Sequence, residues 1–467
     1  MLMPGRVEGW PAGTQRAANP AQRLLSRAVG WWDASFYREG DRFLRNRGTG
    51  RELLDLRLGS SFTANSNDPQ YLPAEDVGYA YLTGSGNTLS VPSEVALDTA
   101  DLDIRMLVAL DQYTPGSTVS LAQRVSGSTG WQLRLLNTSR LNIIIWTSGG
   151  TSLNLSSSAT ASNLMSAKSE DGKPIWLRVT FDADDGAGSY ILRWYTSADG
   201  TTWTQLGGDL SSAAVTIAHA TSSALVAAAN GKVYRLQQLD GIGGTTVLDI
   251  DCDAITSGSA TSFTAVTNQT VTITRSTSGR KSVAMPSRWN GGRACFLLGT
   301  DDFLQVQDTW QHQLLKTDLG DALTVVLVSR EWGTPSFAPL IAKQDNVQAQ
   351  WIGWTLFSNG TNVHFYQSDG AVTVSPGATF SYGATRVAVG RRFPVERVSQ
   401  MRTEASTSPV PATSAQATIN SPSQRLTVGK SSTAPGYSHY EFTAAAVFRR
   451  ALTADEIATI SRHYTGA

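Results

Sequence analysis

The residues best spaced for chemistry are three aspartates that alternate along one short stretch. Asp249, Asp251 and Asp253 lie in the sequence DIDCDA, and the two-residue period of a β-strand would place them on one face. Clustered carboxylate oxygens suit Ca²⁺, so these residues are calcium candidates. The alternative is a strand edge protected by charge. Glycoside hydrolysis needs two carboxyl groups that flank one glycosidic bond. Besides DIDCDA, the stretch DLDIRM from Asp101 is the other candidate for such a pair. Both stretches lack Glu, so no catalytic residue is assigned.

Histidine and cysteine give no further candidates for catalysis or metal binding. The five histidines are scattered, and none forms a pair at metal-ligand spacing; they are His219, His312, His364, His439 and His463. Cys252 and Cys295 are the only cysteines, too few for a disulfide framework, and we expect them to be buried thiols. We expect no cofactor and no enzymatic activity.

Tryptophan offers a second kind of chemistry, the stacking of aromatic rings on sugars. The chain has 13 tryptophans. Trp146, Trp194 and Trp354 lie in or beside expected strands and are candidate glycan platforms. The alternative is core packing, because large aromatic side chains also fill the space between two sheets.

Charge and hydropathy limit the classes of partner. Thirty-eight Lys and Arg balance 38 Asp and Glu, so the chain as a whole has no electrostatic attraction to nucleic acid or anionic lipid. The longest apolar runs, such as LNIIIW and LTVVLV, are far shorter than the roughly 20 residues of a membrane helix. We therefore expect neither nucleic-acid binding nor membrane insertion. The first residues also lack the apolar segment of a secretory signal.

The elements that must position these residues are β-strands. Short runs rich in Val, Ile, Thr, Tyr and Trp alternate with clusters of Gly, Ser, Asn and Asp, as in YILRWYT followed by SADGTT. Asp-Gly and Asn-Gly favour tight hairpin turns. The sequence therefore predicts an all-β protein built from antiparallel strands.

The second half of the chain repeats the first at an offset of roughly 215 to 223 residues, too long for a solenoid repeat. Gly-Trp recurs at 130–131 and 353–354, and WWDASF at 31–36 corresponds to DCDAIT at 251–256. We therefore predict a first domain over residues 28–245 and a second over 246–467. Residues 1–27 carry four Arg and one Glu and form an N-terminal arm, which we expect to dock on a neighbouring subunit.

The chain ends with EFTAAAVFRRALTADEIATISRHY, which predicts a strand followed by a helix. Thr453 and Glu456 have the spacing of a capping box. Ile457 and Ile460 share one helix face, and we expect them to bury apolar area together with Tyr464.

This ending resembles the last strand and terminal helix of laminin-G-like, concanavalin A-like jelly rolls. The segment SYILRWYTSADGTTWTQLG at 189–207 is similar to a strand, turn and strand of the same family, with Trp after the Asp-Gly turn. The resemblance implies two antiparallel jelly-roll sandwiches in tandem and a small C-terminal capping helix.

The phrases GKVYRLQQLDGIGGTTVLDID and WWDASF also resemble tandem jelly-roll proteins of tailed bacteriophages, the minor tail or virion structural proteins. That resemblance implies a non-enzymatic virion protein, located in the tail, which packs on other virion proteins through its arm and its sandwich faces. It also implies possible binding of host cell-surface polysaccharide and a homo-oligomer, with a trimer as one form. Two alternatives remain: a capsid decoration or head-fibre protein, and a secreted carbohydrate-binding module or glycoside hydrolase.

Overall fold

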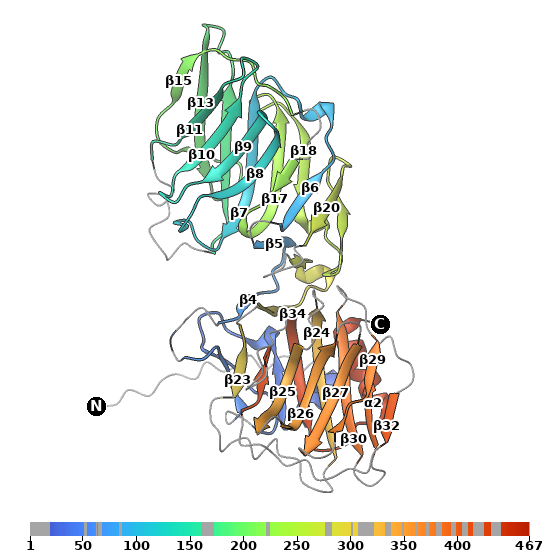
Figure 1. Ribbon diagram of the computed structural model, residues 1–467. Coiled ribbons are helices and arrows are strands. Elements are labelled where there is room, and N and C mark those ends of the chain that lie inside the picture. The colour runs from blue at the N-terminus through green and yellow to red at the C-terminus, as the bar shows by residue number, and fades with distance from the viewer. Residues whose placement is uncertain are drawn as a thin grey trace, which may run out of the picture.

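The computed structural model shows a chain of antiparallel β-strands with two short α-helices. It describes residues 19–466, except 51–53, 62, 64–67, 84–85, 160–171, 221–224, 276–282, 300–301, 307–321, 332–337, 348–349, 360–361, 370–372, 380–384, 394–397, 404–409, 414–424 and 431–439. In the part of the chain described, neither helix has the length and apolar character needed to cross a membrane. The strands form two sandwiches, which lie one above the other in Figure 1.

The first body, sandwich 1, consists of two antiparallel sheets. One runs in the order β14 (Thr204–Gln205), β13 (Ser189–Ser197), β12 (Ile175–Asp182), β7 (Leu102–Leu110), β17 (Asn230–Asp240), β5 (Tyr79–Thr83) and β21 (Val283–Met285), with β15 (Leu210–Ala213) beside β13 and β18 (Thr245–Asp251) beside β17. The other runs in the order β11 (Ser152–Ser156), β10 (Leu141–Trp146), β9 (Thr129–Leu135), β8 (Val119–Ser126), β16 (Leu225–Ala227), β6 (Thr88–Val91), β20 (Thr270–Thr274) and β19 (Ser262–Thr264).

The second body, sandwich 2, repeats this plan. One sheet runs in the order β32 (Val410–Thr413), β31 (Val398–Arg402), β30 (Arg386–Phe393), β24 (Leu323–Glu331), β34 (Tyr440–Phe448), β22 (Cys295–Leu298) and β4 (Gln70–Leu72), with β1 (Gly30–Asp33) beside β34. The other runs in the order β2 (Phe43–Leu44), β3 (Leu56–Leu58), β23 (Leu304–Val306), β33 (Thr427–Val428), β25 (Ala338–Val347), β26 (Gln350–Asn359), β27 (Asn362–Asp369) and β28 (Thr373–Val374), with β29 (Gly377–Thr379) beside β27.

The cores follow from the alternation of apolar residues. Along β13, Tyr190, Leu192 and Trp194 are buried while the residues between them are partly exposed, as expected when one face of a strand meets another sheet. Each sandwich has its own apolar cluster, which includes Ile104 in sandwich 1 and Phe365 in sandwich 2. The expected fold class, all-β with two antiparallel sandwiches and a small C-terminal helix, is confirmed.

The two sandwiches exchange their leading strands. We call β1–β4 (residues 30–72) the first leading segment and β18–β21 (residues 245–285) the second. The first completes sandwich 2, where β1 pairs with β34 and β4 pairs with β22. The second completes sandwich 1, where β18 pairs with β17 and β21 pairs with β5. In Figure 1 the blue strands from the start of the chain accordingly lie among the orange and red strands of the lower sandwich.

This pairing differs from the division expected at residues 245 and 246. The internal repeat is present in the order of the central strands, with differences at the sheet edges, but each repeat begins with strands that belong to the other sandwich. The physical reason is the short turn of residues 241–244, with Gly241 and Gly243 at positive φ, which folds β18 back onto β17. Closing such a short hairpin costs little entropy, so the second leading segment remains with sandwich 1.

Two linkers, residues 73–78 and 286–294, join the sandwiches. The backbone N–H of Arg288 donates to the carbonyl oxygen of Glu75 over 2.6 Å, and its Nη2 donates to the carbonyl oxygen of Ala74. Arg288 lies in the 3-10 helix η7 (Arg288–Asn290). Other short 3-10 helices are η1 (Ala34–Phe36), η3 (Val95–Leu97) and η6 (Cys252–Ala254). Tyr81 and Cys295 belong to one apolar cluster between the bodies. Both cysteines are free and buried, as expected.

Both α-helices pack on the outer face of one sheet of sandwich 2. In helix α2 (Ala454–Thr465), Thr453 and Glu456 form the predicted capping box, and the predicted apolar residues are buried. Helix α1 (Pro20–Leu25) contributes Leu24 and Leu25 to the same apolar cluster. The described end of the expected docking arm therefore packs on its own chain, while residues 1–18 lie outside the described residues.

Candidate functional site

The expected glycan platforms differ in exposure. Trp194 and Trp354 are each 1% exposed and lie between the sheets of sandwich 1 and sandwich 2. They fill the two cores and present no ring face to a sugar, so this part of the prediction is corrected. Trp146 is partly buried at the end of β10, out of phase with the core residues Ile143 and Ile145. Its assignment as a glycan platform stays a prediction.

The three candidate calcium ligands have structural partners. Asp249 accepts hydrogen bonds from Arg235 at 2.6 and 2.8 Å. Asp251 accepts from the backbone N–H of Asp253 and so caps the turn η6. The carboxylate of Asp253 accepts from the backbone N–H of Gly78. Over the residues that the structure describes, no three His, Cys, Asp or Glu side chains gather as metal ligands.

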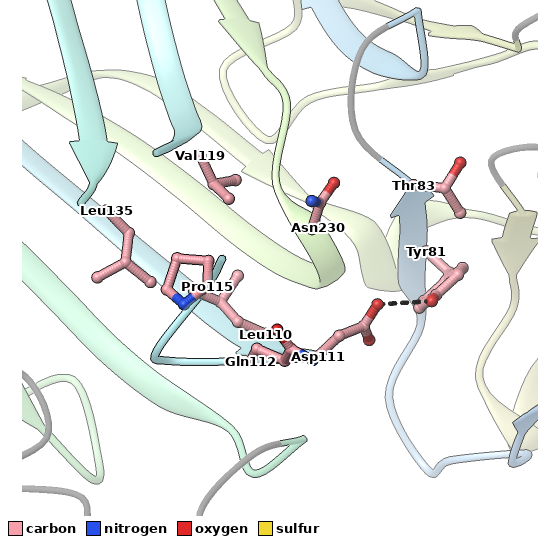
Figure 2. A pocket seen from close by; sticks show the side chains of 9 residues that line it. All are labelled: Tyr81, Thr83, Leu110, Asp111, Gln112, Pro115, Val119, Leu135 and Asn230. Atoms are coloured by element: carbon pink, nitrogen blue, oxygen red, sulfur yellow. Dashed lines mark hydrogen bonds between the residues drawn. The ribbon is translucent and has the colours of Figure 1, made fainter. Parts of the chain in front are cut away.

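A hollow lies at one end of sandwich 1, beside the junction with sandwich 2. This end pocket has a cavity volume of about 270 Å³. Figure 2 shows its lining: Tyr81, Thr83, Leu110, Asp111, Gln112, Pro115, Val119, Leu135 and Asn230. The lining comes from β5, the end of β7, the following loop, the starts of β8 and β17, and the end of β9. The pocket is therefore held by strands of both sheets.

One side of the end pocket is polar and fixed by hydrogen bonds. The Tyr81 hydroxyl donates to the Asp111 carboxylate over 2.8 Å (Figure 2) and also contacts Gln70 Oε1. Gln70 Nε2 donates to the other carboxylate oxygen of Asp111 over 3.2 Å. Since Gln70 lies on β4, the first leading segment helps to orient this carboxylate. Gln112 and Asn230 are exposed at the same rim.

The opposite side of the end pocket is aliphatic. It consists of Leu110, Pro115, Val119 and Leu135. The loop that carries Pro115 is held by Tyr113, which is 3% exposed and whose hydroxyl donates to the carbonyl oxygen of Lys173 over 2.9 Å. A small set of polar groups facing an apolar wall is typical of sites that bind small molecules.

The end pocket can form hydrogen bonds in both directions. Asp111 supplies carboxylate acceptors, while the amides of Gln112 and Asn230 supply both donors and acceptors. Of the nine lining residues that the structure describes, Asp111 alone carries a carboxylate. The arrangement suits a ligand with several hydroxyl groups on one side and C–H groups on the other.

A second surface, on the outer face of β7, β12 and β13, escaped the sequence-based reasoning. Trp176 and Trp203 are partly exposed there and meet edge to face, with ring centroids 6.4 Å apart. The guanidinium groups of Arg105 and Arg178 lie 5.7 and 5.4 Å from the Trp203 ring centroid. Both arginines bind Asp103, which is fully buried. Burial alone would raise the pKa of Asp103, but the hydrogen bonds from the arginines and from Gly243 N–H lower it.

Two local signals could have identified this surface. Trp176 is out of phase with the buried residues Leu177 and Val179 of its strand, and Trp203 directly follows the Asp-Gly turn. That turn folds as predicted: Gly200 has φ +75°, and Asp199 accepts the backbone N–H of Thr201 over 2.8 Å. The hydrogen bonds to backbone N–H groups and Ser197 hold the pKa of Asp199 well below its usual range.

Comparison with known proteins identifies no family. No family matches the sequence, and no curated protein matches it. Among solved structures, the chain is similar to domains LG4-5 of the mouse laminin alpha1 chain, with 11% identity over 84% of this chain and 96% of that one, at TM-score 0.28. It is also similar to the CBM40 of the Ruminococcus gnavus IT-sialidase bound to alpha2,3 sialyllactose, with 10% identity over 30% and 83% of the chains, at TM-score 0.27. Similarities at this level support no inference about ligand or partner.

Proposed function

We propose that this chain is a non-enzymatic structural protein that binds saccharide in the end pocket of sandwich 1. The observation that carries the proposal is the division of that pocket into two sides. Asp111, Gln112 and Asn230 form the polar side and the aliphatic residues form the other. A sugar ring has the same division, with hydroxyl groups at its edge and C–H groups on its faces.

The single carboxylate of the pocket favours binding over hydrolysis. A glycosidase of the usual kind places two carboxyl groups on opposite sides of the scissile bond. In the described lining, Asp111 faces Tyr81 and Gln70, which hold its two oxygens as acceptors. Such a carboxylate orients hydroxyl groups, and the lining that the structure describes holds no second carboxyl group to act as the acid in bond cleavage.

We further propose that the protein belongs to the virion of a tailed phage, as a minor tail component that packs on neighbouring subunits. The support is the resemblance of residues 231–251 and 31–36 to tandem jelly-roll virion proteins. Host cell-surface polysaccharide is then the saccharide. A homotrimer fits the symmetry of tail appendages. Capsid decoration is the alternative location, and immunogold labelling of intact particles separates the two.

The test is binding of the full chain to bacterial surface polysaccharides by isothermal titration calorimetry. Asp111→Ala removes the central acceptor, and we expect at least a tenfold loss of affinity. We expect only a small fall in melting temperature, because the Tyr81 hydroxyl keeps its contact with Gln70 Oε1. Gln112→Ala, at an exposed position, should weaken binding without any structural effect. Asp240→Ala is the control, because Asp240 is an exposed aspartate outside the pocket.

Three outcomes would contradict the proposal. The first is wild-type affinity in both pocket variants. The second is no binding to any polysaccharide tested. The third is the appearance of new reducing ends, which would show hydrolysis and so favour the secreted enzyme.

A further inference from the structure

A second hollow lies in the first leading segment, on sandwich 2. It is open to solvent, with a cavity volume of about 550 Å³. Three exposed arginines, Arg38, Arg45 and Arg47, line it together with Phe36. We call it the arginine hollow. Its lining also holds Asp41 and Asp55, so its formal net charge is +1.

The backbone that carries two of these arginines is held by buried polar groups. Asn46 is 8% exposed, and its Oδ1 accepts the backbone N–H of Trp31 over 2.7 Å and that of Gly48 over 3.0 Å. The carboxylate of Asp55 accepts the backbone N–H of Asn46 over 2.7 Å. Arg45 and Arg47, the neighbours of Asn46, are therefore held at fixed backbone positions.

The charges of the arginine hollow are only partly neutralised. Arg45 pairs with Asp55 at 2.8 Å. The Arg47 guanidinium lies 4.7 Å from the ring centroid of Phe36. Among the residues that the structure describes, no carboxylate forms an ion pair with Arg38 or Arg47. Asp41 also lines the hollow, which leaves an excess of positive charge.

The equivalent strands of the repeat lack these arginines. The second leading segment forms the equivalent strands in sandwich 1, and its first turn is capped by Asp251 as the turn of the first is capped by Asp33. Residues 245–274 nevertheless contain no Lys or Arg. Over the equivalent positions the first leading segment has Arg38, Arg42, Arg45, Arg47, Arg51 and Arg57. Up to the end of β20, the second leading segment therefore forms its strands without basic residues; Arg275 is the first one after them.

We propose that the arginine hollow binds an acidic saccharide, with a sugar carboxylate held by Arg38 and Arg47. Guanidinium groups bind carboxylates through strong charge-assisted hydrogen bonds. The hollow is large enough for more than one sugar ring, in the size range of ordinary ligand sites. This inference rests on the proposed saccharide-binding function and assigns a second, separate site with a preference for negative charge.

The test uses the full chain and two hexasaccharides, a polyuronate and its carboxyl-reduced neutral form, with sodium acetate as the free anion. We expect the wild type to bind the polyuronate at least tenfold more tightly than the neutral form, with an affinity that falls as salt rises. The double variant Arg38→Gln with Arg47→Gln should lose this difference. Its matched control is Arg23→Gln with Arg140→Gln, which removes the same charge at two exposed arginines outside the hollow.

The outcomes separate this inference from the proposed function. If the wild type bound both hexasaccharides equally and Asp111→Ala bound neither, saccharide binding in the end pocket would be supported. The proposed binding of acidic saccharide in the arginine hollow would be overturned. Retention of the polyuronate preference in the Arg38 and Arg47 double variant would also overturn it. Acetate that competes as well as the polyuronate would show a simple anion site and reject the saccharide. Circular dichroism and the melting temperature check that each variant is folded.

Discussion

Trp354 shows how one buried side chain decides between a binding role and a structural one. It is 1% exposed and belongs to the same apolar cluster as Leu356 on its own strand and Phe365 on the neighbouring one. Its sequence neighbour Gly353 has φ +115°, as Gly130 has φ +100° before Trp131 in sandwich 1. In both sandwiches, the tryptophan that follows this glycine is buried in the core.

Replacing Trp354 by Ala should destabilise sandwich 2. The lost contacts and the cavity left behind cost about 3–5 kcal/mol for a buried tryptophan. We expect a lower melting temperature by differential scanning calorimetry. Trp176→Ala is the comparison, because Trp176 is partly exposed on the outer face of sandwich 1 and should cost much less. A Trp354→Ala protein as stable as the wild type, with weaker glycan binding, would restore the platform assignment.

The sequence could predict which residues of a strand share a face, and it indicates the buried face only where the other residues of that face are apolar too. In β13 the period groups Trp194 with Tyr190 and Leu192, and their apolar character indicates the core. In β12 it separates Trp176 from Leu177. Tryptophan is itself apolar, so composition alone does not distinguish these positions. The arginines around Trp203 come from two strands, a non-local arrangement that no local pattern encodes.

At the scale of the element, the C-terminal helix was the best predicted part of the chain. Its start depends on groups three residues apart: Glu456 N–H donates to Thr453 Oγ1, and Thr453 N–H donates to the Glu456 carboxylate over 2.9 Å. Its docking surface was harder to predict. The helix packs on the outer face of β24, β30 and β34, where Ala444 and Ala446 belong to the same apolar cluster as Ile457 and Ile460, and it does not close the core between the sheets.

The cap of this helix should respond to pH. The hydrogen bonds from Arg450, 2.7 and 2.8 Å long, are the main cause that lowers the pKa of Glu456 to about 2. A carboxyl group whose pKa is depressed by folding stabilises the fold above its unfolded pKa, and that contribution is lost as pH falls toward the folded value. The stabilisation by Glu456 should therefore be complete above about pH 4.5 and vanish toward pH 2.

The measurement is the difference in unfolding free energy between the wild type and Glu456→Gln across this range. We expect the difference to shrink steadily on acidification, because the glutamine side chain of the variant does not titrate. Thr453→Ala should cost about 1 kcal/mol at neutral pH, as for other N-caps. Asp455→Asn is the control, because Asp455 lies in the same first turn but forms no part of the capping box. A constant difference at all pH values would contradict this account of Glu456.

At the scale of the whole molecule, the exchange of leading segments is what the sequence could not show. Repetition identified WWDASF and DCDAIT as equivalent, and the structure corrects this by two residues. Asp33 ends β1 and caps η1 as Asp251 ends β18 and caps η6, so WWDASF corresponds to residues 249–254. Which sandwich each one joins depends on pairing across long distances in the chain, as between Trp31 and Ala446. Alternation specifies a face and not a partner, so the boundary of a sequence repeat need not be the boundary of a folded unit.

The exchange makes sandwich 1 a continuous unit inside the chain and sandwich 2 a discontinuous one. A fragment of residues 73–287 contains every strand of sandwich 1, so we expect it to unfold in one cooperative thermal transition. A fragment of residues 28–245 has nearly the same length but lacks β18–β21, and with them Ile250 and Ile273 of the core. It leaves the edges of β5, β6 and β17 unpaired, which favours aggregation.

Size-exclusion chromatography and near-ultraviolet circular dichroism should find a folded monomer only for the fragment of residues 73–287. Equal folding of both fragments would mean that the first leading segment can replace the second, and that the partner is chosen by the length of the connection and not by the sequence of the strands.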